Sequence, residues 1–291
     1  MTAGITPLAH GLAAPALYDW LTAQREAEGE RPTADGTRLR GSWAGECDRK
    51  IAFHVLNVEP DHQPDGATLA AFAVGQQWHE TIQHAWIDAY GGQQEVKVTL
   101  RNQGFDLSGH ADLVYTDDFD RKIVGEIKSI SSFGYALAVT GLPPRPKKTD
   151  RPGPCGPKYE HLLQAAIYAT AADADAVHLI YVNKDKLGEV AEWLISLDFT
   201  LPAYGKSLRE MAQAELLRMQ DILRMLDEDG LLPERHIPGF GFVQSPPRHH
   251  TDGGRGDPWQ CRYCPFNRKC RELPSGPTPL GWLDTNHEEV F

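Results

Sequence analysis

The fold of this chain is decided by the stretch FDLSGHADLVYTDDFDRKIVGEIKSI, which runs from Phe105 to Ile130. Its two apolar runs, at 105–115 and 122–130, read as strands, and the consecutive aspartates between them mark a turn. A further strand is expected immediately before them, at 95–101. Together the three strands predict an antiparallel meander.

Helical patterns surround this meander on both sides. Helices are expected at 14–28, 46–56, 68–90, 160–172 and 203–226, with two more strands at 176–183 and 189–199. The order of helix, meander, helix and strand predicts an α/β fold, with a mixed central sheet flanked by helices.

Composition narrows the class of protein. The 291 residues carry a formal net charge of −11, which argues against a protein that coats nucleic acid electrostatically. Basic residues still gather locally, between Arg145 and Lys158 and between Arg262 and Arg271, as a guided substrate path would require. No apolar run approaches the ~20 residues of a membrane span, and the N-terminus lacks the features of a secretory signal. We therefore expect a cytoplasmic protein without a membrane partner.

The meander carries a group of residues suited to metal chemistry. Asp112 lies on its second strand, and Glu126 and Lys128 lie on its third. Side chains alternate along a strand, so Glu126 and Lys128 share one face while Ile127 turns towards the core. Two neighbouring carboxylates repel unless a cation lies between them, and Mg²⁺ or Mn²⁺ meets that need, with the backbone carbonyl of Ile127 as a further ligand. Such a site can hydrolyse a phosphodiester, with the lysine orienting the water.

The same residues also allow a simpler interpretation. Glu126 and Lys128 can be an ordinary exposed pair on one strand face, and Asp112 can be an acid beside a turn. A Glu-x-Lys pattern occurs by chance in most proteins. Its position on an apolar strand, after a Gly-x-x-Asp strand and a hairpin turn, favours the catalytic interpretation.

In the order of these motifs the chain resembles the PD-(D/E)XK nuclease superfamily, and within it the RecB-like exonucleases. These include the CRISPR-associated RecB-like exonuclease family and related phage recombination nucleases. His79, on the helix before the meander, is similar to the family's helical metal ligand. Gln164 and Tyr168 match its Gln-x-x-x-Tyr helix, where both side chains lie on one face and would support Lys128 or contact substrate. Taken singly, His79 can be structural and the Gln–Tyr pair can be the polar edge of a helix.

Four of the five cysteines form a second candidate site. Cys261, Cys264 and Cys270 lie close together near the C-terminus, and Cys47 is the available fourth ligand. Zinc and a [4Fe–4S] cluster both accept four thiolates. The arrangement of one cysteine plus three resembles the iron–sulfur RecB-like nucleases, which favours the cluster over zinc. Cys155 has no partner in this scheme.

The resemblance implies a restriction-endonuclease-like fold with a helical iron–sulfur portion built from both termini. We expect a single nuclease domain over residues 1–291, with a catalytic α/β core at 67–200 and a cluster-binding portion formed by 41–60 and 231–275. The implied activity is metal-dependent DNA exonuclease action on single strands or ends. Its settings would be recombination, repair or CRISPR-type DNA processing, with a helicase, recombination or CRISPR adaptation partner. The alternatives are a non-catalytic DNA-binding or assembly subunit, and a zinc-stabilised interaction module.

Overall fold

The computed structural model of the protein describes residues 13–28, 36–153, 155–186, 188–237, 248–249 and 259–283. Parts of the predicted 231–275 region, at 238–247 and 250–258, lie outside the described residues, as do both ends of the expected 1–291 domain. Within the described ranges the α-helices are α1 (Ala13–Glu28), α2 (Asp48–Val55), α3 (Gly66–Tyr90), α4 (Ser132–Thr140), α5 (Tyr159–Ala171), α6 (Leu208–Arg224), α7 (Trp259–Arg262) and α8 (Asn267–Glu272).

A mixed sheet of six strands, counted over the described residues, forms the centre of the molecule. Its strands are β1 (Leu39–Arg40), β2 (Gln93–Thr99), β3 (Leu107–Thr116), β4 (Lys122–Ile130), β5 (Ala176–Asn183) and β6 (Val190–Ser196). The order is β1-β3-β4-β5-β6, and β2 also pairs with β3. The predicted meander is present, because β2, β3 and β4 pair in antiparallel fashion. β4 and β5 are parallel, since α4 and α5 connect them.

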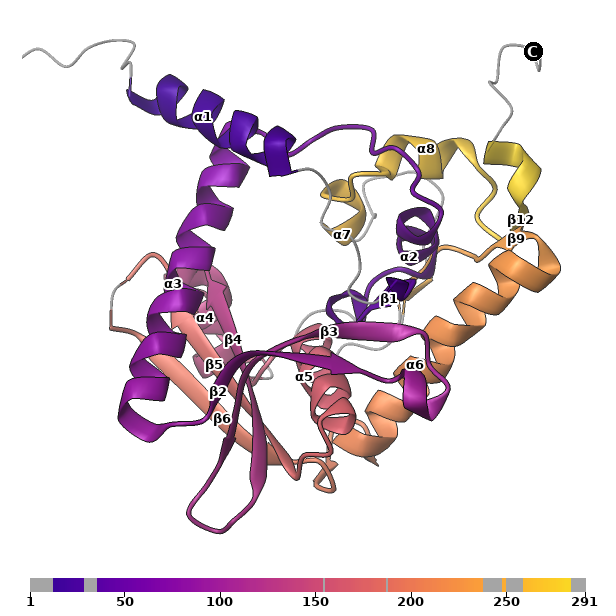
Figure 1. Cartoon of the computed structure of the whole chain (residues 1–291). Coiled ribbons are helices and arrows are strands. Elements are labelled where there is room, and N and C mark those ends of the chain that lie inside the picture. The colour runs from indigo at the N-terminus through magenta and orange to yellow at the C-terminus, as the bar shows by residue number, and fades with distance from the viewer. Residues whose placement is uncertain are drawn as a thin grey trace, which may run out of the picture.

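Helices cover both faces of this sheet, as Figure 1 shows. α3 lies on one face, where Trp78, Ile82, Trp86 and Ile87 pack against a small buried cluster that contains Ile127. α5 and α6 lie on the other face, over the main core. Successive residues of β4 alternate between the two faces, so Glu126 and Lys128 lie on the opposite side from Ile127, as predicted.

The structure differs from the sequence expectation in two connections. α4 follows β4 directly, where the sequence predicts no helix; it begins at the cap residue Ser131, whose side chain accepts a hydrogen bond from the backbone N–H of Gly134. The expected helix from residue 203 begins instead at Leu208, after a hairpin of β7 (Thr200–Leu201) and β8 (Lys206–Ser207). Ser207 and Glu210 form a capping box that determines this start.

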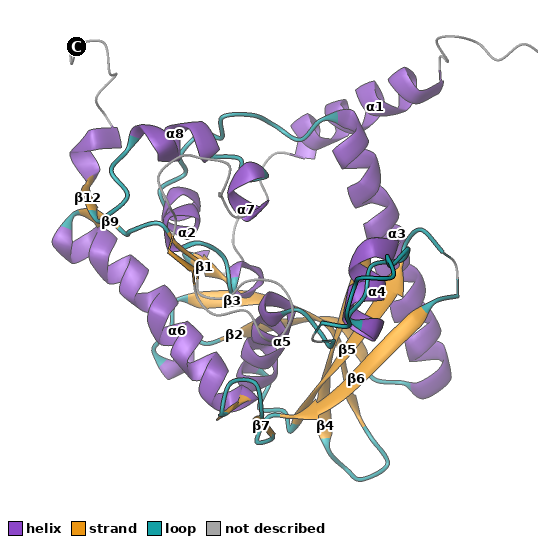
Figure 2. Cartoon of the chain, turned by 180° about the vertical axis from the view of Figure 1, so that it is seen from behind, coloured by secondary structure: helices purple, strands orange, loops and turns teal. Residues whose placement is uncertain are grey.

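α2 and the segments that follow α6 come together away from the sheet. Figures 1 and 2 both show α2 beside α7 and α8. Nearby, β9 (Leu231–Leu232) pairs with β12 (Thr278–Pro279), and β10 (His236–Ile237) pairs with β11 (Arg248–His249). α1 lies across the start of α3. None of the helices in the described ranges has the length and apolar character needed to cross a membrane.

Candidate active site and cysteine pocket

Asp112 lies where β3 separates from β4. The register of the two strands ends at the pair Leu113 and Gly125, one residue short of Asp112. Beyond that point, Asp112 Oδ2 accepts a hydrogen bond of 2.7 Å from the backbone N–H of Ile127, so a carboxylate replaces the missing strand acceptor. The N–H and C=O groups of one strand residue point to the same side, so the carbonyl of Ile127 faces the same opening.

Glu126 and Lys128 form a buried pair beside this opening. Glu126 is 1% exposed, and its Oε1 lies 2.7 Å from Lys128 Nζ. Burial raises the pKa of Glu126 to about 7, against the opposing effect of Lys128. Burial alone would lower the pKa of Lys128, but the Glu126 carboxylate together with Asp112 and Glu160 outweighs it, and the net shift is upwards. The ammonium therefore stays charged at the site.

His79 reaches this group from α3. Its Nδ1 lies 3.6 Å from Asp112 Oδ2, which is longer than a hydrogen bond. His79 and Asp112 both act electrostatically on Glu126, in opposite directions. The structure thus brings His79, Asp112, Glu126 and Lys128 together from three elements that are separate in sequence.

The Gln-x-x-x-Tyr pair on α5 contacts this site from the side of the main core. Gln164 Oε1 accepts a 2.9 Å hydrogen bond from Lys128 Nζ, in agreement with the support expected for that lysine. Tyr168 hydrogen bonds Gln164 and is only 3% exposed, so the expected contact of Tyr168 with substrate is not available in this structure. Its ring lies against Gly41 and Gly109; an added Cβ would be 2.2 Å from the ring at Gly41 and 2.5 Å from the hydroxyl at Gly109.

Sequence reasoning missed Gln83, which holds Asp112 in place, and Glu95, which holds Gln83. Gln83 is buried on α3, and its Nε2 donates to the carbonyl of Asp112 at 3.2 Å and to Glu95 Oε1 at 2.6 Å. Glu95 lies opposite Asp112 and has a φ of 51°, in the left-handed region where a glutamate is strained. The spacing of Gln83 four residues after His79 was the available signal, because such residues share a helix face.

The residues at the site fit a divalent cation. Glu126 Oε2 is buried and has no hydrogen-bond partner among the described residues. A buried carboxylate oxygen without a partner is costly, and carboxylate oxygens are the ligands that Mg²⁺ and Mn²⁺ prefer. As they stand, the described His, Cys, Asp and Glu side chains form no group of three that is arranged to hold an ion. The ammonium of Lys128 instead forms an ion pair with Glu126 Oε1.

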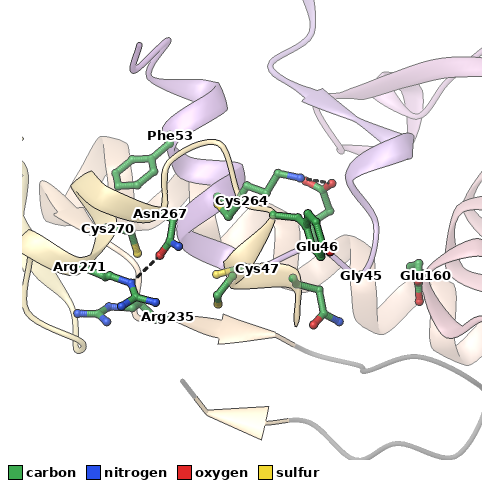
Figure 3. A pocket seen from close by; sticks show the side chains of 14 residues that line it. Gly45, Glu46, Cys47, Phe53, Glu160, Arg235, Cys264, Asn267, Cys270 and Arg271 are labelled. Carbon is green, nitrogen blue, oxygen red and sulfur yellow. Dashed lines mark hydrogen bonds and ion pairs between the residues drawn. The ribbon is translucent and has the colours of Figure 1, made fainter. Parts of the chain in front are cut away.

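The four predicted cysteines line one cavity of about 220 Å³. Figure 3 shows Cys47, Cys264 and Cys270 around it, and Cys261 also belongs to its lining. Cys47 caps the start of α2, Cys261 lies in α7 and Cys270 lies in α8, so the cavity joins α2 to the two helices near the C-terminus. All are free cysteines, and Cys155 is exposed elsewhere.

This cavity has a chemistry suited to thiolate ligands. Burial raises the pKa of Cys270, while the nearby guanidinium groups of Arg49 and Arg235 act to lower it. Arg49 is 0% and Arg235 5% exposed, so two positive charges are buried beside one sulfur. Burial outweighs these charges, so the net pKa of Cys270 is raised, but the two arginines reduce the cost of forming the thiolate, which is the form that binds zinc or an iron–sulfur cluster. Four cysteines around one cavity are the set of donors that either group uses.

Comparison with known proteins adds little to this description. No protein-family model and no curated protein matches the chain. One similar solved structure, the crystal structure of SSO0001, is 17% identical in sequence, with a TM-score of 0.48. The match covers 90% of this chain and 97% of that chain. This similarity is too low to carry an argument about function.

Proposed function

We propose that this protein is a metal-dependent deoxyribonuclease of the PD-(D/E)XK, RecB-like type. One observation carries the proposal: His79, Asp112, Glu126 and Lys128 converge where β3 and β4 separate, and one oxygen of the buried Glu126 lacks a partner among the described residues. A structural ion pair would not need the imidazole and second carboxylate at the same point. A hydrolytic site would use all four.

The roles follow from the contacts of each residue. His79, Asp112, Glu126 and the carbonyl of Ile127 would hold one Mg²⁺ or Mn²⁺. A bound divalent ion would activate a water and neutralise charge on the phosphoryl oxygens. Lys128 is held by Glu126 and Gln164, so its ammonium is already oriented to hydrogen bond the attacking water or a phosphate oxygen. Gln164 and Tyr168 act by positioning that lysine.

The cysteine pocket would hold a [4Fe–4S] cluster. Cys47, Cys261, Cys264 and Cys270 supply four thiols from two segments that are far apart in the chain. A cluster bound there would join these segments and stabilise the fold, because closing a long loop at a metal site adds binding free energy to folding. The iron-to-zinc ratio of anaerobically purified protein, with its visible absorption, distinguishes the cluster from zinc.

The substrate of the proposed nuclease is DNA, as single strands or ends. Exposed basic residues in the loop before α5, including Lys147 and Lys148, would attract the phosphate backbone of DNA, although the protein as a whole is acidic. Exonucleolytic processing in recombination, repair or CRISPR-type adaptation is the setting that the motif order suggests.

The test is Mn²⁺- or Mg²⁺-dependent degradation of end-labelled single-stranded DNA. We expect Glu126→Gln and Lys128→Met each to reduce the rate by roughly 10²-fold or more, because each removes a charge that acts on the reacting phosphate. Glu228→Gln, an exposed carboxylate far along the chain in the π-helical turn Met225–Asp229, is the matched control and should retain full activity. Wild-type protein without metal-dependent activity, or unchanged activity in both site variants, would refute the proposal.

A further inference from the structure

His161 lies on α5 one turn before Gln164, the residue that hydrogen bonds Lys128. Residues three apart share a helix face, so His161 and Gln164 face the same side of α5. The sheet gives the same placement, because Lys128 on β4 is in register with Tyr181 on β5, and Tyr181 contacts His161. His161 therefore lies beside Lys128, although the proposed mechanism gives it no role.

One nitrogen of this imidazole is held by a buried tyrosine. His161 Nδ1 lies 2.6 Å from the hydroxyl of Tyr181, whose side chain is 0% exposed, and the two ring centroids lie 5.4 Å apart in an edge-to-face contact. The oxygen of the same hydroxyl accepts a 2.9 Å hydrogen bond from the backbone N–H of Lys158. These contacts fix the position and the plane of the imidazole before any ligand binds.

The contacts of the hydroxyl also favour one tautomer of His161. The Tyr181 hydroxyl has a single proton, and His161 Nδ1 is the acceptor that the described residues place within its reach. A buried hydroxyl proton without an acceptor is costly, so the hydroxyl donates to Nδ1 and the imidazole proton lies on Nε2. Burial lowers the pKa of His161 well below its ordinary value, and the charges of Lys128 and Lys158 lower it further, so the ring is neutral.

The other nitrogen of His161 is available to a ligand. Nε2 has no hydrogen-bond partner among the described residues, and it is not one of their enclosed polar atoms, so it can be reached from solvent. A neutral N–H donor near the ammonium groups of Lys128 and Lys158 suits an anionic oxygen acceptor. The backbone of a nucleic acid supplies such an oxygen at every phosphate.

We propose that His161 is a substrate-binding residue of the proposed active site: its Nε2–H donates to a non-bridging phosphate oxygen of the DNA strand, beside the phosphodiester that Lys128 contacts. The inference rests on the proposed nuclease and adds to it a contact that binds the strand. Tyr181 is the positioning residue that keeps the proton on Nε2. A ring fixed in this way loses little freedom on binding, which favours affinity.

The test is the binding of a short, fluorescently labelled single strand of DNA, measured by anisotropy in EDTA so that no strand is cut. His161→Phe keeps a flat ring against Tyr181 and removes both nitrogens, so the dissociation constant should rise roughly tenfold, because a hydrogen bond to a charged group is lost. His161→Gln retains an N–H near the place of Nε2 and should stay within about threefold of wild type. His84→Phe, at an exposed histidine on α3, is the matched control and should bind as wild type does.

A second series of measurements identifies the phosphate. Oligonucleotides that each carry one uncharged methylphosphonate, at successive linkages, remove the acceptor charge of one phosphate at a time. One position should weaken binding by the wild-type protein and have no effect on His161→Phe, because the two changes remove the same hydrogen bond. A residue that only supports the fold would weaken the binding of every oligonucleotide by the same factor, and that result overturns the inference.

If His161→Phe does not fold, the nitrogen chemical shifts of the histidines in isotopically labelled wild-type protein decide, with His161→Gln identifying the resonance. DNA should shift the Nε2 resonance of His161, and an unshifted resonance or a proton on Nδ1 overturns the inference. Wild-type protein that binds single strands through this phosphate without cutting them refutes the proposed nuclease and leaves the His161 contact standing. Wild-type protein that cuts DNA while His161→Phe binds it equally well overturns the role of His161 alone.

Discussion

The site where β3 and β4 separate, called here the β3–β4 site, and the cysteine pocket are built in opposite ways. The site at His79, Asp112, Glu126 and Lys128 is formed by α3, β3 and β4, which lie near one another in the chain, so its residues are positioned by regular backbone. The pocket takes one cysteine from the start of α2 and three from residues 261–270, more than two hundred positions later. The first site needs only the sheet and the helices α3 and α5, whereas the second requires α2 to meet the segment 260–271.

The pocket is also supported by buried charged residues. Behind the pocket, Glu215 on α6 accepts a 2.6 Å hydrogen bond from the backbone N–H of Gly45 and pairs with Arg218. Arg218 also pairs with Asp48, which lies 3.0 Å from His236 Nδ1. This buried charge network connects the core to the residues around Cys47. Substitutions in the first region should therefore change mainly activity, and substitutions in the pocket should change mainly stability. The following variants test this difference.

The largest effect is expected at the pocket. Cys264→Ser removes one of four ligands, so the protein should lose its cluster and its unfolding temperature should fall on the order of 10 °C. Differential scanning calorimetry with iron analysis measures both quantities. Cys155→Ser changes an exposed cysteine outside the pocket and should change neither. An unfolding temperature in Cys264→Ser equal to that of Cys155→Ser would show that α2 and the C-terminal helices hold together without the cluster.

The next largest effect is the pH dependence of Mn²⁺ binding at the β3–β4 site. The pKa of Glu126 is raised to about 7 in the metal-free protein, so the carboxyl is protonated below that pH and must lose its proton to bind a cation. The dissociation constant for Mn²⁺ should rise roughly tenfold for each pH unit below 7 and level off above it. Isothermal titration from pH 5.5 to 8.5 measures this. Glu126→Gln should bind weakly without that slope, and an identical slope in the variant would assign the proton to another group.

The same raised pKa predicts how the metal-free fold responds to pH. An unfolded glutamate titrates near its ordinary value of 4.5, and the folded Glu126 near 7. Between these values the folded state binds more protons than the unfolded state, so the Glu126 contribution to stability is lost as pH rises through this window. Urea unfolding of metal-free protein should show this slope, which saturating Mn²⁺ should reduce. A slope that Mn²⁺ leaves unaltered would contradict the assignment.

A smaller effect is expected where the core supports the site. Gly109→Ala places a Cβ 2.5 Å from the Tyr168 hydroxyl, so the ring must move and Gln164 should shift away from Lys128. We expect roughly tenfold slower DNA hydrolysis with the cluster retained, because small misplacements of catalytic groups are costly. Gly134→Ala, whose new Cβ meets nothing closer than 3.7 Å, is the control. Full activity in Gly109→Ala would show that Tyr168 does not help to position Lys128.

The smallest effect is expected in the loop that leads from α4 towards α5. α5, which follows this loop, contributes Gln164 to the β3–β4 site and Glu160 to the lining of the pocket. Replacing Lys147 and Lys148 together by Ala should weaken single-stranded DNA binding several-fold and reduce its salt dependence, with the rate at saturation unchanged. Fluorescence anisotropy against salt measures this, with Lys186→Ala as control. Unaltered salt dependence would place the DNA path elsewhere.

The sequence by itself determined what depends on the repeat of the backbone. Strand alternation placed Glu126 and Lys128 on one face and Ile127 on the other, and the helical repeat placed Gln164 and Tyr168 together. The limits of β4 and β5 were predicted to the residue, at 122–130 and 176–183. These features follow from local geometry, which neighbouring residues specify.

Only the tertiary structure decided what depends on burial. No pattern in the sequence signals that Arg49 is fully enclosed, that Tyr168 is sealed between Gly41 and Gly109, or that Glu95 adopts a left-handed backbone opposite Asp112. The same holds for the pKa of Glu126, which burial raises. Desolvation and close packing arise from residues distant in the chain, so neighbouring residues cannot specify them.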